Sequence, residues 1–242
     1  MGTLRGAVGF LTRIPVSADG DDWDAFARAP WAFPVVGWLV GGLAALALFV
    51  PTLGVPFAYL VALVLVTGVN HFDGLADLGD AMVVHGDSER RRAVLKDSEV
   101  GVGAVLALGV ALVGLALAGL GLARLPLRTG VTVVLASEVG AKLAMAALAC
   151  TGRASHEGFA SAFTEQCDPT DMVGPLVVAV PAVGLAAFGG LAVPAALAAP
   201  PAVAWWLRRW ADEKLGGVNG DVFGATNELG RLAGLYAGLL LV

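Results

Sequence analysis

Three aspartates stand close together at the start of a polar segment, 71–100. Asp73, Asp77 and Asp80 are spaced at i, i+4 and i+7, so on a helix their carboxylates lie on one face. Like charges repel each other there unless a cation lies between them. Mg²⁺ commonly takes one or two carboxylates together with phosphates and waters. The spacing therefore predicts a Mg²⁺ site, and a solvated acidic helix edge is the alternative that spacing alone leaves open.

Basic side chains follow these aspartates within the same segment. Lys96 and Asp97 belong to the sequence KDSEVG, just before a long apolar run, and Arg90, Arg91 and Arg92 precede them. Cations beside carboxylates can hold phosphate groups that carboxylates alone repel. Lys96 and Asp97 are therefore functional candidates, with Lys96 a candidate phosphate contact. The three arginines are explained more simply by membrane topology.

A second polar segment, GGVNGDVFGATNEL at 216–229, is rich in glycine. Gly217 and Gly220 allow the backbone to approach a ligand closely and to offer amide groups to a phosphate. Asn219 and Asp221 add side-chain contacts, with Asp221 a further candidate metal ligand. Because 33 of the 242 residues are glycine, ordinary turns and helix packing stay open as an explanation.

Four ionisable residues lie inside apolar runs, where charge is costly and usually paired or functional. Glu138 and Lys142 are four residues apart, and Glu228 and Arg231 are three apart. These spacings predict a structural ion pair in each case, with a substrate contact by Lys142 as the functional alternative. His71, which adjoins the aspartates, is a candidate substrate-binding residue, with capping or simple hydrogen bonding as its alternative.

The amino-acid composition indicates the class of protein that carries these polar residues. Apolar residues make up 57% of the chain and charged residues only 14%, against roughly a quarter charged in an average soluble protein. This excludes a disordered chain, and two cysteines exclude a disulfide scaffold. A net charge of -5 with no long basic run argues against a nucleic-acid partner. We predict an all-α, polytopic transmembrane helix bundle, embedded in lipid and forming one domain over 1–242.

The apolar runs predict about seven membrane-spanning helices. Four single spans are expected at 33–50, 57–70, 101–123 and 131–150, a pair broken near Gly189 and Gly190 within 172–206, and a last span at 222–242. With a cytoplasmic N-terminus, eleven of the 15 Lys and Arg residues fall inside, and only Arg124 and Arg128 fall outside. This topology places the loops 71–100, 151–171 and 207–221 on the cytoplasmic face of the cell membrane.

Several separate motifs make the chain resemble the cobalamin 5'-phosphate synthase family, also called adenosylcobinamide-GDP ribazoletransferase. They are FLTRIP at 10–15, FPVVGWLVG at 33–41, HFDGLADLGDA at 71–81, LKDSEVGVGA at 95–104 and GGVNGDVFGATNEL at 216–229, in the family's order. Two positions depart from the family pattern: Ala81 replaces a glycine, and Asn219 replaces a threonine.

The resemblance implies a Mg²⁺-dependent phosphotransferase of cobalamin biosynthesis. Such enzymes join adenosylcobinamide-GDP to α-ribazole or its 5'-phosphate and release GMP. The family motifs fall on catalytic Asp73, Asp77 and Lys96. The substrate-binding positions are His71, Lys142, Gly217, Asn219 and Gly220, and the metal ligands are Asp73, Asp77, Asp80, Asp97 and Asp221. Ser98 also matches the family motif. Whether ribazole or its phosphate is preferred, and whether the chain forms a homo-oligomer, stays open.

Two other functions are compatible with parts of the sequence. A CDP-alcohol phosphotransferase also uses membrane-surface aspartates, but its D-G-x-x-A-R continuation is absent after Asp73 and Gly74. A transporter would use Glu138, Lys142 and Glu228 as an intramembrane relay. However, seven of the 20 acidic residues lie in the single segment 71–100, which favours the enzyme.

Overall fold

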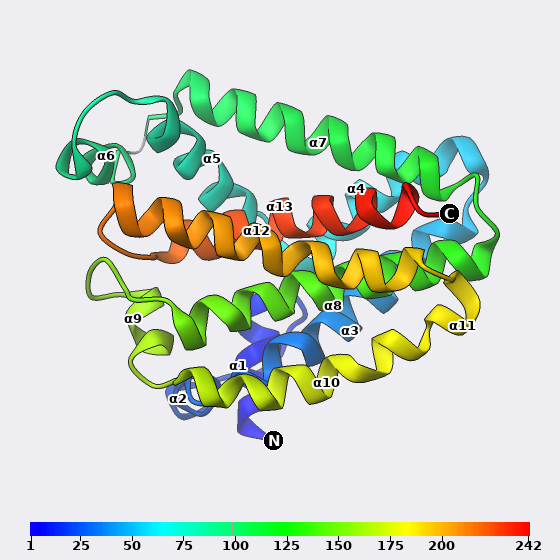
Figure 1. Ribbon diagram of the computed structural model, residues 1–242, viewed down its shortest axis with the longest axis horizontal. Coiled ribbons are helices and arrows are strands. Elements are labelled where there is room, and N and C mark those ends of the chain that lie inside the picture. Colours follow the sequence, from blue (N-terminus) through cyan, green and yellow to red (C-terminus); the bar gives the residue numbers. More distant parts are fainter. Residues whose placement is uncertain (98) are drawn as a thin grey trace.

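The computed structural model describes residues 1–97 and 99–242 and, over this part of the chain, is built from helices without a β-strand. Most of the long helices run along a common axis, so that the loops gather at two opposite ends (Figure 1). The predicted all-α class is therefore confirmed.

Within the described residues, four segments are long and apolar enough to cross a membrane. The first is α3 (Ala32–Ala45) with the 3₁₀ turn η1 (Leu46–Phe49), the second is α7 (Val102–Leu122) and the third is α8 (Leu127–Thr151). The fourth joins η3 (Pro169–Met172), α10 (Val173–Gly184) and α11 (Ala186–Gly189). A fifth is obtained if Thr52–Thr67 and Asn70–Val83, bent by 99° to each other, are counted as one span. These helices indicate a membrane protein.

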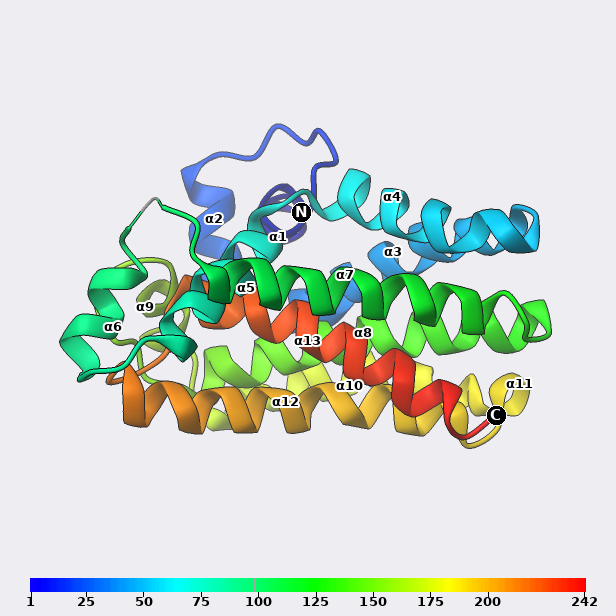
Figure 2. The same ribbon diagram turned by 90° about the horizontal axis from the view of Figure 1, so that it is seen from above.

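The prediction of seven spans is not confirmed, because two long helices are too polar to qualify by composition. They are α12 (Ala192–Lys214) and α13 (Gly220–Leu239). Helix α13 packs against α5 (Asn70–Val83), α7, α8 and α12 and lies between its neighbours in both views (Figures 1 and 2). A helix enclosed by protein can carry polar groups that lipid would exclude, so hydropathy underestimates it.

Burial separates the inner helices from the outer ones. Of the apolar window in α8, 89% is buried, against 28% in α7 and 17% in the segment Pro169–Gly189. The outer helices expose valine and leucine side chains such as Val105, Val110, Val177 and Val180, as expected for surfaces that face lipid. The predicted break between the paired spans is confirmed, since α11 ends at Gly189 and α12 begins at Ala192.

A small N-terminal unit lies beside this bundle (Figure 2). It consists of α1 (Gly2–Leu11) and α2 (Gly20–Ala27), joined by an ion pair of 2.9 Å between Arg5 and Asp22. Phe10, at the end of α1, stacks on Phe159 of α9 (Phe159–Thr164) with ring centroids 4.6 Å apart. The N-terminal unit thus reaches the loops at one end of the bundle.

The three charged loops lie at that same end of the bundle (Figure 1). One carries α6 (Ser88–Val94), the next carries α9, and the third joins α12 to α13. A parallel bridge between Ala154 and Val218 links the second to the third, and Arg92 donates to the carbonyl of Leu215 at 3.2 Å, which links the first to the third. Their predicted meeting on one face is confirmed, while the side of the membrane stays a prediction.

Candidate functional site

The acidic helix α5 (Asn70–Val83) crosses α13 with almost no space between the two backbones. A Cβ added to Gly74 would lie 2.9 Å from the Cα of Asp221, and one added to Gly224 would lie 3.0 Å from the carbonyl oxygen of His71. Both distances are too short for a side chain, so glycine is required at this crossing. The crossing brings the aspartates of α5 next to the start of α13.

The charges of two of these aspartates affect the pKa of Asp221. Burial, followed by the charge of Asp77, raises the pKa of Asp221 to about 6, and Asp73 adds to the rise. A hydrogen bond from Asn219 Nδ2 to Asp221 Oδ2, at 2.8 Å, opposes it. A carboxyl group whose pKa is raised by burial and by neighbouring carboxylates is a candidate ligand for a cation.

Asn219 has a second task at the same helix end. Its side-chain oxygen accepts a hydrogen bond of 3.0 Å from the amide of Val222 and so caps α13. A capped helix start directs a partial positive charge towards whatever lies beyond it. Asparagine therefore holds both the helix terminus and the Asp221 carboxylate in place.

A pocket of about 230 Å³ opens where the three loops meet. Its polar lining is Arg92, Lys96, Ser155, His156, Asn219 and Asp221. Two permanent cations, a histidine and the start of α13 thus surround a space suited to a phosphate group. The fold brings Lys96, a candidate phosphate contact, to this pocket. It also brings Arg92 there, although membrane topology was the simpler explanation for the presence of that arginine.

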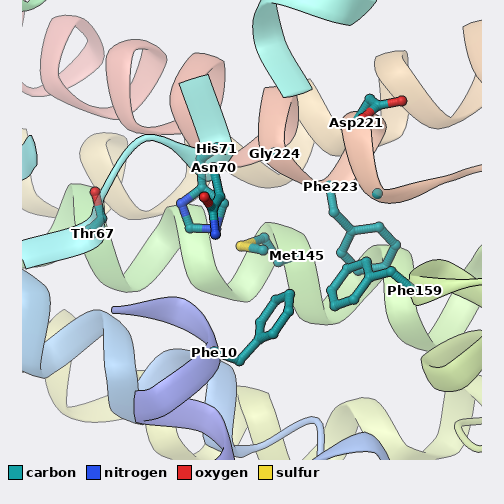
Figure 3. Close-up of a pocket in the computed structure, with 10 residues that line it drawn as sticks. Phe10, Thr67, Asn70, His71, Met145, Phe159, Asp221, Phe223 and Gly224 are labelled. Atoms are coloured by element: carbon teal, nitrogen blue, oxygen red, sulfur yellow. The ribbon is translucent and has the colours of Figure 1, made fainter. Parts of the chain in front are cut away.

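A second pocket, of about 190 Å³, lies on the other side of Asp221. Figure 3 shows its lining: Phe10, Thr67, Asn70, His71, Met145, Phe159, Asp221, Phe223 and Gly224, together with Gly220. Aromatic rings form much of this lining, whereas cations line the first pocket. Asp221 lines both pockets, so it stands at their junction.

Asp80 and Asp97 lie apart from this junction. The two carboxylate oxygens of Asp80 accept the amides of Gly101 and Ala104, at 2.8 and 3.0 Å, and so cap the start of α7. Asp97 is exposed and accepts the amide of Glu99. Both line a separate pocket of about 470 Å³. Their assignment to metal stays a prediction, and the motif residue Ser98 lies outside the described residues.

Within residues 1–97 and 99–242, no three His, Cys, Asp or Glu side chains form a ready-made metal cage. The chemistry of Asp73, Asp77 and Asp221 nevertheless fits Mg²⁺, which keeps several waters and takes substrate phosphates as ligands. A substrate phosphate bound in the cationic pocket beside Asp221 would supply such oxygens.

Gly217 lies close to backbone rather than to an open pocket. Its φ is +144°, and an added Cβ would lie 2.4 Å from the carbonyl oxygen of Arg153. Its amide donates to the carbonyl of Ala211 at 3.1 Å, and the amide of Val218 donates to Arg153 at 2.8 Å. The Gly217 amide therefore closes the turn after α12, the Val218 amide joins two loops, and substrate binding by Gly217 stays a prediction.

The buried charges pair differently from the sequence prediction. Arg231 contacts Glu228, as expected, but it also binds both carboxylate oxygens of Glu138. The predicted direct pair of Glu138 with Lys142 is wrong, because the planar guanidinium offers a bidentate contact that an ammonium cannot. Lys142 instead donates to Asn227 Oδ1. The four ionisable side chains are fully buried and balance in charge.

Sequence reasoning missed Asn227 and the aromatic lining. Asn227 connects Lys142, His71 and Glu228 through hydrogen bonds. A polar amide within a predicted membrane span was the available signal for it. Phe10, Phe159 and Phe223 come from three separate segments, and no spacing in the sequence indicates that they meet.

Comparison with known proteins places this geometry in a family. The family model for cobalamin-5-phosphate synthase matches residues 3–239. The chain belongs to this family. It is 51% identical to the adenosylcobinamide-GDP ribazoletransferase of Halorubrum lacusprofundi, over 98% of this chain and 96% of that protein. The protein of the same name from Haloquadratum walsbyi is 43% identical over 98% and 97%, and that of Ralstonia nicotianae 30% identical over 95% and 92%.

No solved structure matches the chain. Membership of the cobalamin-5-phosphate synthase family nevertheless makes the chain an enzyme of cobalamin synthesis, a transferase. The resemblance drawn from the motifs is therefore confirmed.

Proposed function

We propose that this chain joins adenosylcobinamide-GDP to α-ribazole or its 5'-phosphate, giving adenosylcobalamin or its 5'-phosphate and GMP. The reaction is the one named for its relatives. The observation that best supports it is the position of Asp221, which lines both a cationic and an aromatic pocket and whose pKa is raised by burial and by the charges of Asp77 and Asp73. Such an arrangement suits the meeting of a pyrophosphate with an alcohol.

The chemistry is transfer of a phosphoryl group between two oxygens. A ribose hydroxyl of the ribazole attacks the cobinamide-side phosphorus, a new P–O bond forms, and the P–O bond to GMP breaks. The hydroxyl proton passes to a carboxylate oxygen of the aspartate group. Asp221 is best placed to receive it, because it lines both pockets.

Basic groups of the first pocket bind the pyrophosphate. Lys96 and Arg92 neutralise the transferred and leaving phosphates, and the start of α13 adds its partial positive charge. Asn219 orients Asp221 through the 2.8 Å hydrogen bond. These side chains come from two loops, so pyrophosphate binding depends on the two loops remaining together.

Asp73, Asp77 and Asp221 are the residues that would hold Mg²⁺. The ion would supply positive charge to the phosphate oxygens, where negative charge accumulates during the transfer. Asp80 and Asp97 would contribute only by leaving their present hydrogen bonds.

The proposed location is the cell membrane, with the site facing the cytoplasm. Eleven of the 15 Lys and Arg residues lie on one side of the expected topology, which supports this orientation. Both substrates are large polar molecules that would approach from water, and the pockets lie at the end of the bundle where the three charged loops meet. Transport through the bundle is less well supported, because Glu138, Glu228 and Arg231 are bound to one another.

The test is an assay of the detergent-purified chain with adenosylcobinamide-GDP, α-ribazole and Mg²⁺. We expect GMP and the joined corrinoid to appear in equal amounts, and only when all three components are present. Lys96→Gln should reduce turnover strongly, whereas Lys214→Gln, at an exposed lysine paired with Glu213, should not. GMP release that does not depend on ribazole would contradict the proposal.

A further inference from the structure

The hydrogen bonds around Asn227 fix the direction in which its amide points. Lys142 only donates hydrogen bonds, so the Asn227 oxygen must be the atom that faces the Lys142 ammonium. The Asn227 nitrogen then directs one hydrogen to Glu228 Oε1 at 2.8 Å and the other to His71 Nδ1 at 3.2 Å. Each group in this chain of contacts has one consistent role.

The orientation of Asn227 determines where His71 carries its proton. Since Asn227 donates to Nδ1, that nitrogen must be an acceptor without hydrogen. The proton of the neutral ring is then on Nε2, at the other edge of the imidazole. Glu228 Oε1, 3.9 Å from Nδ1, already accepts a hydrogen bond from Asn227, and the other carboxylate oxygen, Oε2, binds Arg231.

Within the described part of the chain, His71 forms a hydrogen bond through Nδ1 and none through Nε2. Nε2 is also not among the fully buried polar atoms that lack a partner there, so it is accessible from the surrounding space. The His71 ring lines the aromatic pocket (Figure 3). Nε2–H is therefore a donor available to a ligand in that pocket. Held in this way, His71 can donate a hydrogen bond but cannot remove a proton from the substrate.

The remaining lining suits a flat, largely apolar ring. Phe159 meets Phe223 edge to face with centroids 5.4 Å apart, and Phe10 stacks on Phe159. Met145 adds a polarisable thioether. A planar ligand with one acceptor atom would match this combination of aromatic edges and a single fixed donor.

We propose that this pocket holds the heteroaromatic base of the ribazole, and that Asn227 fixes His71 as the hydrogen-bond donor to the unsubstituted ring nitrogen of that base. The inference rests on the proposed function and names the part of the acceptor substrate that the pocket takes. A benzimidazole joined to ribose through one nitrogen keeps the other as an acceptor. The ribose then extends towards Asp221, at the junction of the pockets.

The test compares α-ribazole with the matching indole riboside, in which a C–H replaces that nitrogen. The wild-type enzyme should prefer α-ribazole in kcat/KM by at least about tenfold, because the indole leaves Nε2–H without a partner. His71→Gln places an amide donor near the Nε2 position and should keep most of the preference. His71→Leu should accept both substrates within about twofold.

An unchanged preference in His71→Leu would overturn the inference while leaving the proposed function intact. Absence of ribazole-dependent GMP release from the wild type would contradict the proposed function, and the inference with it. Phe57→Ala, at a 74% exposed outer position, is the control for loss of an aromatic ring and should match the wild type, whereas Phe159→Ala should raise KM for ribazole.

A second measurement does not depend on any variant being stable. The chain has three histidines, so ¹⁵N-labelled histidine gives a spectrum simple enough to assign. We expect the His71 ring to carry its proton on Nε2 and the Nε2 signal to shift when α-ribazole is added. A proton on Nδ1, or a His71 signal unchanged by α-ribazole, would overturn the inference.

Discussion

Asp221 shows how one carboxyl group acquires its properties from its surroundings. It is partly buried, the charges of Asp77 and Asp73 raise its pKa, and Asn219 holds one of its oxygens. The spacing of the α5 aspartates predicts a metal site. That spacing gives no sign of Asp221, because Asp221 comes close to these aspartates only where α5 and α13 cross, and the two helices lie far apart in the sequence.

The raised pKa of Asp221 leads to a prediction about pH. Its carboxyl group is protonated below about pH 6, and a protonated carboxyl group neither binds Mg²⁺ nor accepts the hydroxyl proton. At limiting Mg²⁺ we therefore expect turnover to fall as the pH drops through about 6. In Asp221→Asn this acid limb should disappear along with most of the activity. A wild-type profile flat from pH 5 to 8 would be the contrary result.

Replacing Asp80, unlike its neighbours on α5, should affect the stability of the protein rather than its Mg²⁺ dependence. Because it caps α7 with both oxygens, Asp80→Ala should lower the free energy of unfolding by about 1–2 kcal/mol. Thermal unfolding in detergent measures this loss. The Mg²⁺ concentration for half-maximal turnover should stay close to that of the wild type. A large increase in that concentration would instead return Asp80 to the metal ligands.

At the scale of elements, the crossing of α5 with α13 is what assembles the site. The motifs predicted that both segments carry functional residues, but the sequence could not indicate that Gly74 and Gly224 lie at their contact, since 33 glycines fit many packing roles. Hydropathy located the outer helices well. It failed for α13, whose buried polar groups Asn227, Glu228 and Arg231 are hidden from lipid by neighbouring helices, and for α12, whose charged residues lie at its exposed C-terminal end.

Widening the crossing should separate the aspartates without removing any of them. In Gly74→Val the new side chain must displace the Asp221 backbone, whose Cα is only 2.9 Å from the added Cβ. A displacement of about 1 Å costs on the order of 10²-fold in rate. We expect this loss in kcat with helix content unchanged by circular dichroism. The matched variant Gly109→Val, with open space around its Cβ, should keep normal turnover.

At the scale of the whole molecule, a balanced set of buried charges holds the central helices together. Arg231 joins α13 to α8 through Glu138 and neutralises Glu228 at the same time. Arg231→Met leaves both carboxylates without their partner, and we expect a loss of about 3–5 kcal/mol in stability. Thermal inactivation in detergent measures this. Unchanged inactivation would mean that the contacts of Arg231 contribute little.

The orientation of the bundle can be tested by labelling introduced cysteines. In a background with Cys150 and Cys167 replaced by alanine, Glu157→Cys lies in the loop between α8 and α9, one of the three charged loops, and Leu53→Cys lies in the turn η2 (Thr52–Gly54) between two of the apolar segments. An impermeant thiol reagent added to intact cells should label only Leu53→Cys. Labelling of Glu157→Cys alone would reverse the topology and place the pockets outside.

We propose that Asp73, Asp77 and Asp221 hold a divalent ion against the pyrophosphate. The decisive measurement is the Mg²⁺ dependence of GMP release in Asp77→Asn. We expect the half-saturating Mg²⁺ concentration to rise by at least about tenfold, with turnover partly recovered at high Mg²⁺. Normal turnover by Asp77→Asn at limiting Mg²⁺ would contradict it.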